Sequence, residues 1–253
     1  MTWNPEQYHK FQSERFAPFD DLVKLVHVKP NLKVIDLGCG TGELTRRLAD
    51  MLPESDVLGI DSSAEMLAKT EAQARPGLTF KQQDLQELDG QWDLVFSNAV
   101  IQWVPDHPKL IPQLIELVKP GGQLVVQLPS NHDHPSHVFV RDIAGEEPYR
   151  TELDGWVRQP PVLTIFEYAE LLYQHGGPEL TIYEKAYPHV LENSDGLAEW
   201  TSGTLLVPYF ARLPEDMKDA FMSDYRKRLK ERWPESPVFY PFRRTLFAVT
   251  RSK

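Results

Sequence analysis

The chain has 253 residues and a formal net charge of −10 at pH 7, which argues against a nucleic-acid groove or an anionic membrane surface as its partner. Its single cysteine, Cys39, excludes an internal disulfide and fits a reducing compartment. No apolar run approaches the roughly 20 residues that a membrane-spanning helix needs, and the polar N-terminus is unlike a secretory signal. We therefore expect a cytoplasmic protein.

Strand and helix patterns alternate over the first half of the chain. The apolar runs predict buried strands at residues 34–37, 56–61, 78–85, 92–98 and 123–128. The segments at 44–51, 64–74 and 109–118 predict helices, of which the second begins after Ser62 or Ser63 as a cap. Near-continuous apolar strands suit a parallel sheet covered on both faces. This alternation predicts a doubly wound, Rossmann-like α/β sheet with right-handed crossovers.

After Pro129 the pattern changes. Residues 129–161 predict a loop followed by a short helix, 164–177 an amphipathic helix that ends at glycines, and 179–191 an exposed strand. Residues 194–233 look helical in two or three pieces, and 242–251 predict a last strand. We expect one domain over residues 1–253, with a helical insertion at 194–234 before the final strand.

The stretch "VIDLGCGTGELTRRLADML", from Val34 to Leu52, places a glycine turn between a buried strand and a helix. A phosphate-binding P-loop would need Lys and Ser or Thr after its last glycine, but Glu43 and Leu44 follow Gly42. A dinucleotide site would need G-x-G-x-x-G, whereas here the third glycine comes one position early. The acid at Asp36 favours a ligand that carries an ammonium group, such as the methionine part of S-adenosylmethionine.

Polar residues also close the next three predicted strands. Asp61 lies about 20 residues further on, where a carboxylate can accept hydrogen bonds from both ribose hydroxyls. Asp84 is placed to meet the adenine amino group, and Asn98 ends the fourth strand. Any one of them could simply cap a helix. Together they point to a ligand at the carboxyl ends of the strands, where open α/β sheets bind ligands.

The ordered segments "VIDLGCGTG", "GIDSSAEML", "QQDL", "WDLVFSNAVIQWVPD" and "KPGGQLVVQL" resemble the motifs of class I S-adenosylmethionine-dependent methyltransferases. The resemblance implies a mostly parallel seven-stranded sheet with an antiparallel last strand. It also implies that S-adenosylmethionine is the cofactor and S-adenosylhomocysteine the product. The implied cofactor-binding residues are Asp36, Gly38, Gly40, Asp61, Ser62, Met66, Asp84, Leu85, Asn98 and Ala99.

The flanking segments resemble a narrower group, the trans-aconitate methyltransferases. The matching stretches include "WNPEQYHKFQSERFAPFDDL", "LPSNHDHPSH", "LAEWTSGTLLVPYF" and "PFRRTLFAVTR". This resemblance implies methyl transfer to a carboxylate of a small polycarboxylic acid. Where the group would have an asparagine-tryptophan pair after the fifth strand, this chain has Asn131 and His132, so its acceptor pocket can differ.

A carboxylate acceptor is already ionised at neutral pH, so no catalytic base is expected. A polyanionic acceptor calls for arginine, whose planar fork binds carboxylates in a bidentate manner. Arg15 belongs to a predicted N-terminal helical lid at residues 1–30, and Arg243 and Arg244 are adjacent on the last strand, so only one of them can point inward. The resemblance favours Arg244. The full set of predicted acceptor-binding residues is Tyr8, Arg15, Trp103, His132, His137, Trp200 and Arg244, and the insertion at 194–234 is expected to form part of the pocket.

The histidines His132, His134 and His137 are spaced H-x-H-x-x-H, but without supporting carboxylates this is a weak signal, and we predict no metal. The favoured function is a carboxyl O-methyltransferase for a small polycarboxylate, without nucleic-acid or membrane partners. Two alternatives stay open: the same fold with another small-molecule acceptor, and a non-catalytic S-adenosylmethionine-binding protein. The oligomeric state is not determined by the sequence, and a monomer is the simplest expectation.

Overall fold

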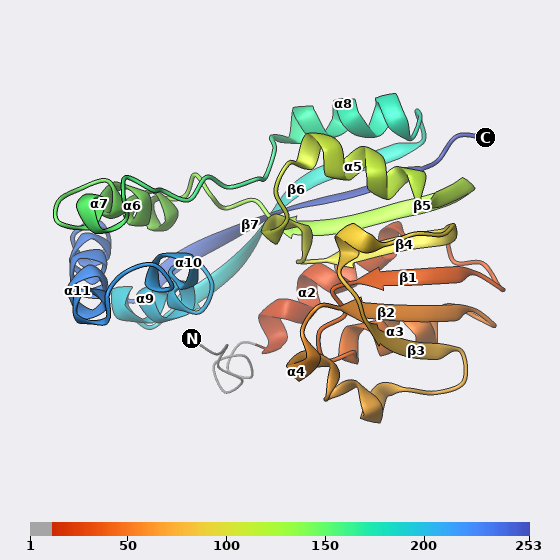
Figure 1. Ribbon diagram of the computed structural model, residues 1–253, viewed down its shortest axis with the longest axis horizontal. Coiled ribbons are helices and arrows are strands. Elements are labelled where there is room, and N and C mark those ends of the chain that lie inside the picture. Colours follow the sequence, from red (N-terminus) through yellow and green to blue (C-terminus); the bar gives the residue numbers. More distant parts are fainter. Residues whose placement is uncertain (1–11) are drawn as a thin grey trace. The chain divides into compact units, whose positions relative to one another are not determined.

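The computed structural model describes residues 12–253, with side chains from Phe16 onward (Figure 1). The chain divides into two compact units. The sheet unit comprises Phe16–Pro129, Pro161–Lys185 and Arg244–Lys253. The helical unit is built mainly from Ser130–Pro160 and Ala186–Arg243. Strands β6 (Leu180–Leu191) and β7 (Val238–Thr250) contribute residues to both units.

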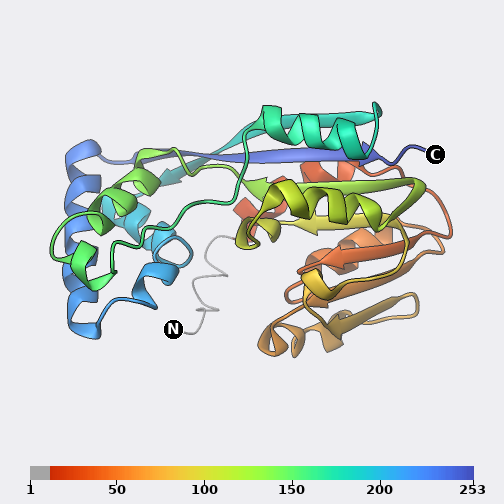
Figure 2. The ribbon, with the colours of Figure 1, turned by 45° about the horizontal axis from the view of Figure 1, so that its top comes forward.

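A seven-stranded sheet runs in the order β3-β2-β1-β4-β5-β7-β6 (Figure 2). The first five strands pair in parallel, and β7 pairs antiparallel with β5. The predicted fold, mostly parallel with an antiparallel last strand, is therefore confirmed. The strands not yet delimited are β1 (Lys33–Leu37), β2 (Asp56–Asp61), β3 (Leu78–Gln82), β4 (Trp92–Asn98) and β5 (Val118–Pro129).

Helices cover both faces of this sheet, as the two-sided apolar strands predict (Figure 1). On one face, α5 (His107–Glu116) and α8 (Ile165–His175) pack against side chains that include Val95 and Phe247. On the other face, α2 (Gln12–Leu22) and α3 (Glu43–Met51) pack against Phe96 and Val125. Alternate residues of each strand therefore belong to different cores. Short turns complete this unit: α4 (Ala64–Leu67) and the 3-10 turns η1 (Val23–Leu25), η2 (Thr70–Gln73), η3 (Leu85–Glu87) and η4 (Ile101–Trp103).

Local sequence explains where several of these helices begin. Thr164 and Glu167 form a capping box at the start of α8, in which each side chain binds the other residue's backbone amide. Ser63 accepts a hydrogen bond from the Met66 amide and starts α4. The helix predicted over 64–74 is broken, because the Thr70 hydroxyl donates to the Leu67 carbonyl oxygen at 2.8 Å and the chain continues as η2.

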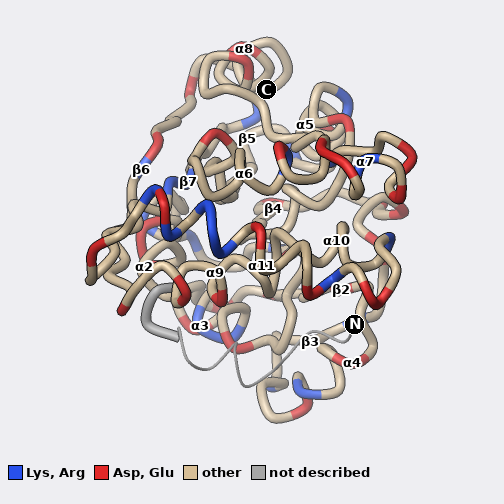
Figure 3. Tube along the Cα trace, turned by 90° about the vertical axis from the view of Figure 1, so that its left-hand side faces the viewer, with Lys and Arg blue, Asp and Glu red and all other residues tan. Residues whose placement is uncertain are grey.

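The helical unit has a core of its own, in which Tyr209, Phe221 and Tyr225 are fully buried. Residues 194–233 form three helices, in agreement with the prediction, and two further helices follow β5. Along α11, Lys and Arg segments mix with Asp and Glu segments (Figure 3), with acids in the first turn and bases in the last, as the helix dipole favours. The helices are α6 (Pro135–Ala144), α7 (Tyr149–Glu152), α9 (Ser194–Ser202), α10 (Val207–Phe210) and α11 (Glu215–Arg232).

Among the described residues, no helix combines the length and apolar character needed to cross a membrane.

Candidate functional site

The glycine turn after β1 has a backbone that only glycine adopts easily. Gly38, Gly40 and Gly42 have φ angles of +68°, +57° and +78°. A Cβ atom on Gly38 would lie 2.3 Å from a methyl group of Val100, so a side chain there would also clash. The Cys39 amide donates to the Ile60 carbonyl oxygen at 2.8 Å, which ties the turn to β2. The turn is thus a fixed cradle at the carboxyl ends of β1 and β2.

Asp61, at the end of β2, holds this cradle in place. Its Oδ2 accepts from the Gly40 amide at 2.9 Å, and its Oδ1 accepts from the Ser63 amide at 2.8 Å. A carboxylate has about four acceptor positions, so each oxygen can still accept a ligand hydroxyl. Ser62 is exposed beside it, and the Met66 methyl lies 3.4 Å from the position a Cβ on Gly40 would take. The predicted residues Asp61, Ser62 and Met66 therefore surround the cradle.

Asp36 is buried beneath the turn, with 4% of its surface exposed. Burial raises the pKa of its carboxyl group to about 7, an effect that the nearby Asp61 charge increases and a 2.6 Å hydrogen bond from the Thr45 hydroxyl opposes. Burial, and then the charges of Asp36 and Asp61, also raise the pKa of the Cys39 thiol. Cys39 is therefore a neutral thiol, consistent with a packing role.

Asp84 does not end a strand, contrary to the prediction. Strand β3 stops at Gln82, because the Asp84 carboxylate accepts from the Gln86 amide at 2.9 Å and caps the turn η3. The Asp84 side chain is exposed, and Leu85 packs partly against the core of the sheet unit. Both residues still follow the carboxyl end of β3, as an adenine contact would require.

Asn98 and Ala99 stand at the end of β4. Within the described part of the chain, the buried Oδ1 of Asn98 has no hydrogen-bond partner. Ala99 has a φ angle of +59°, which is uncommon for a residue other than glycine, and its amide donates to the Gln127 carbonyl oxygen at 2.8 Å. Backbone strain of this kind clusters at ligand sites.

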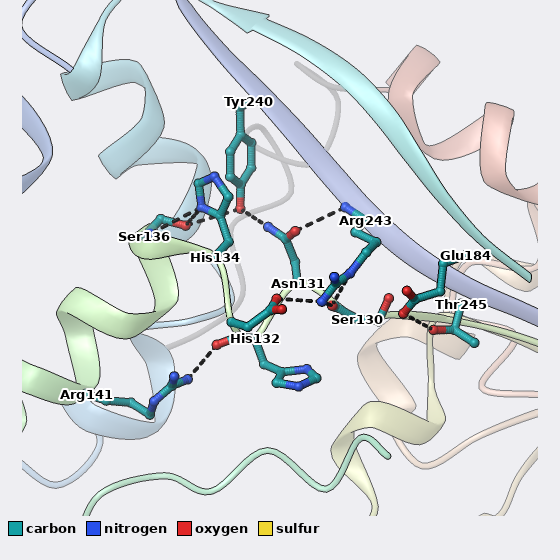
Figure 4. A network of polar contacts seen from close by, with 11 residues as sticks. Ser130, Asn131, His132, His134, Ser136, Arg141, Glu184, Tyr240, Arg243 and Thr245 are labelled. Carbon is teal, nitrogen blue, oxygen red and sulfur yellow. Dashed lines mark hydrogen bonds and ion pairs between the residues drawn. The ribbon is translucent and has the colours of Figure 1, made fainter. Parts of the chain in front are cut away.

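The two adjacent arginines of β7 have different surroundings. The Arg243 guanidinium donates to the Ser130 carbonyl oxygen at 2.8 and 3.0 Å and to the Asp133 carboxylate at 2.5 Å, inside the helical unit (Figure 4). Arg244 lies opposite Pro129 of β5 in the sheet unit. Because neighbouring strand residues face opposite sides, these contacts of Arg243 favour Arg244 as the ligand-binding arginine.

The remaining predicted acceptor residues belong to both units. Trp103, in the sheet unit, is 51% exposed. His132 and His137 belong to the helical unit; the His132 carbonyl oxygen accepts from Arg141 at 2.7 Å (Figure 4). Burial, and then the neighbouring His134, Arg141, His132 and Arg158, lower the pKa of His137 to about 3, so its imidazole is neutral at pH 7.

Trp200 packs against His189 in the same helical unit, with ring centroids 4.6 Å apart. Tyr8 lies outside the described residues, and of Arg15 only the backbone, in α2, is described. The part of these residues in acceptor binding stays a prediction.

The second histidine of the H-x-H-x-x-H spacing, His134, has a structural role. The His134 imidazole caps α6 by accepting from the Ser136 amide at 3.2 Å, and it stacks on Trp233 with the ring centroids 5.5 Å apart. Across residues 12–253, no group of three or more His, Cys, Asp or Glu side chains is arranged to hold a metal.

Gln127 of β5 is a further candidate site residue, which the sequence patterns do not indicate. Its side chain is fully buried, and neither polar atom of its amide has a hydrogen-bond partner among residues 12–253. Gln123, four residues earlier, accepts from the His27 amide at 2.7 Å and donates to the Leu25 carbonyl oxygen at 3.3 Å. In the sequence, Gln127 is recognisable only as a glutamine near the end of a mostly apolar central strand.

A polar hollow of about 330 Å³ lies elsewhere, before β2 and β3, lined by residues that include Asp50, Ser55 and Arg75. Asp50 is paired there with Arg46 at 3.0 Å and Arg75 at 2.9 Å. This hollow lies at the amino ends of β2 and β3, whereas open α/β sheets bind ligands at the carboxyl ends of their strands.

Comparison with known proteins agrees with this geometry. Residues 28–163 match a family model described as a methyltransferase domain. A trans-aconitate 2-methyltransferase of Deinococcus radiodurans is 49% identical, and one of Azoarcus sp. is 36% identical, each over 99% of both chains. A crystal structure titled as a putative methyltransferase from Bacillus halodurans has a TM-score of 0.62 at 15% identity and covers 94% of this chain and 100% of its own. The chain therefore belongs to the S-adenosylmethionine-dependent methyltransferases, in the group whose full-length members are named trans-aconitate 2-methyltransferase.

Proposed function

We propose that this enzyme transfers a methyl group from S-adenosylmethionine to a carboxylate of a small polycarboxylic acid, and that trans-aconitate is its acceptor. The names of its full-length relatives support the acceptor. The observation that carries the proposal is the edge of the sheet unit, where Asp36, Asp61 and Asn98 lie at strand ends beside a glycine turn in which a Cβ on Gly38 or Gly42 would clash.

The residues present fit S-adenosylmethionine. Asp61 has an acceptor position left on each oxygen for the ribose hydroxyls, and Asp84 and Leu85 follow β3 on the adenine side. Burial raises the pKa of the Asp36 carboxyl group to about 7, and an ammonium group beside it would favour its anionic form. When bound, the cofactor supplies an electrophilic methyl group.

The acceptor needs orientation rather than activation. A carboxylate is ionised at neutral pH, with a pKa near about 4, so no residue has to remove a proton from it. Alignment of the reacting groups can supply roughly 7–11 kcal/mol in favourable cases. Arg244, at the carboxyl edge of the sheet unit, is suited to hold a carboxylate, because its guanidinium fork can bind both oxygens.

The test is transfer of labelled methyl from S-adenosylmethionine to a panel of di- and tricarboxylic acids, with amines, phenols and monocarboxylic acids as controls. We expect a base-labile methyl ester, formed most efficiently with trans-aconitate. Label on an amine or a phenol would support the alternative acceptor class. Cofactor binding without any transfer would support a non-catalytic protein.

A further inference from the structure

Two glutamines on one face of β5 differ in their surroundings. Gln123 and Gln127 are both buried and lie on the same side of the strand, four residues apart. Gln123 joins the end of η1 and the residues after it to the sheet, through hydrogen bonds with Leu25 and His27. For the Gln127 amide, no hydrogen bond forms anywhere in residues 12–253. A buried amide without a hydrogen bond lowers the stability of the folded state, and a ligand that bonds to it would offset this cost.

Strand register shows which side chains share the face of Gln127. Gln127 is the lateral partner of Asn98 on β4 and of Leu246 on β7. Arg244, two residues before Leu246 and opposite Pro129, is therefore the diagonal neighbour of Gln127 on the same face. Long side chains reach one another across such a diagonal. Asn98, Gln127 and Arg244 thus form a polar row at the carboxyl edge of the sheet unit.

The chemistry of this row suits a carboxylate. The Arg244 guanidinium only donates hydrogen bonds, and the Gln127 amide adds two N–H donors without adding charge. A glutamate at position 127 would instead repel an anion. We propose that Gln127 is an acceptor-binding residue, whose Nε2 donates to the same substrate carboxylate that Arg244 binds, while its Oε1 accepts from the Arg244 guanidinium in that complex.

This inference rests on the proposed function, and it is tested with Gln127→Met, Gln127→Glu and the matched control Gln123→Met. The readouts are the acceptor KM, the Kd of S-adenosylhomocysteine and the Tm of the ligand-free protein. We expect Gln127→Met to raise the acceptor KM about tenfold or more, because a hydrogen bond to a charged group is lost, with the Kd changed less than twofold. Its Tm should equal or exceed that of the wild type, since the substitution removes an unpartnered amide.

Gln123→Met should behave in the opposite way, with a lower Tm and an unchanged acceptor KM, and Gln127→Glu should raise the KM further than Gln127→Met. An unchanged acceptor KM in Gln127→Met, a fall in Tm matching that of Gln123→Met, or a Kd weakened in parallel with the KM would each overturn the assignment. Failure of the wild type to methylate any polycarboxylic acid would instead refute the proposed function itself.

Discussion

The helical unit and the carboxyl edge of the sheet unit treat buried polar groups differently. In the helical unit, the Asn131 amide donates to the Tyr240 hydroxyl at 3.0 Å and accepts from the Arg243 amide at 3.1 Å (Figure 4), and the hydroxyls of Thr201 and Tyr225 lie 2.9 Å apart. The Ser130 hydroxyl, at the start of that unit, is one exception among the described residues.

At the edge of the sheet unit, the Ser97 hydroxyl, the Asn98 Oδ1 and both polar atoms of the Gln127 side chain are buried and have no hydrogen-bond partner within the described chain. Buried polar groups that form hydrogen bonds within the protein stabilise one fold. Buried polar groups without such bonds reduce its stability unless a ligand bonds to them. The difference teaches that Asn131 and Thr201 stabilise the helical unit itself, whereas Asn98 and Gln127 keep hydrogen-bonding capacity at the sheet edge.

The largest effect is expected where the cradle allows no side chain. Gly38→Ala should destabilise the protein by roughly 2–5 kcal/mol, because it combines an unfavourable positive φ with a clash against Val100. Adding Val100→Ala to Gly38→Ala should restore the stability lost through the clash. The stability lost through the unfavourable φ angle should remain. Chemical denaturation of both variants measures this, and a Gly38→Ala protein as stable as the wild type would show that the turn is not a rigid cradle.

The adjacent arginines offer a direct contrast between a binding role and a structural role. Arg244→Met should raise the acceptor KM by about tenfold to a hundredfold, the loss expected for hydrogen bonds to a charged ligand, with little change in cofactor Kd. Arg243→Met should instead lower the Tm, since its guanidinium binds Ser130 and Asp133, and leave the acceptor KM almost unchanged. Steady-state kinetics measures the acceptor KM of each variant, and calorimetry measures its cofactor Kd and Tm. Equal effects of the two substitutions on the acceptor KM would contradict the separate roles of Arg243 and Arg244.

A smaller effect concerns pH. The Asp36 carboxyl has a raised pKa of about 7 in the folded state, against about 4 when unfolded, so its contribution to stability is complete below pH 4 and is lost as the pH rises through 7. In the ligand-free protein, Asp36→Asn should therefore melt several degrees above the wild type at pH 8, and this gap should narrow towards pH 5. Scanning calorimetry at both pH values measures the gap. A Tm difference independent of pH would mean that burial does not raise the pKa of the Asp36 carboxyl group.

Much of the sheet could be predicted from sequence, because two-sided burial leaves a clear apolar run in each central strand. The run of Trp92–Asn98 matches β4 at both ends. Errors arose where a polar side chain redirected the backbone: Asp84 ends β3 early, and Thr70 interrupts the helix after β2. These hydrogen bonds between side chain and backbone depend on local geometry, which cannot be predicted from the spacing of apolar residues.

The candidate site divides in the same way. Residues on the glycine turn and the strand ends, such as Gly38, Asp61 and Asn98, follow from strand position and could be predicted. Gln127 could not, because its significance depends on the absence of partners in the folded sheet, and the satisfied Gln123 looks the same in sequence. Likewise, only the folded chain shows that Arg243 is engaged by Ser130 and Asp133.

The most direct test is a crystal structure of the enzyme with S-adenosylhomocysteine and trans-aconitate. We predict ribose hydroxyls on Asp61, the methionine ammonium near Asp36, and one acceptor carboxylate held between Arg244 and the Gln127 amide. A nucleoside bound away from the glycine cradle, or an acceptor without contact to Arg244, would contradict this account.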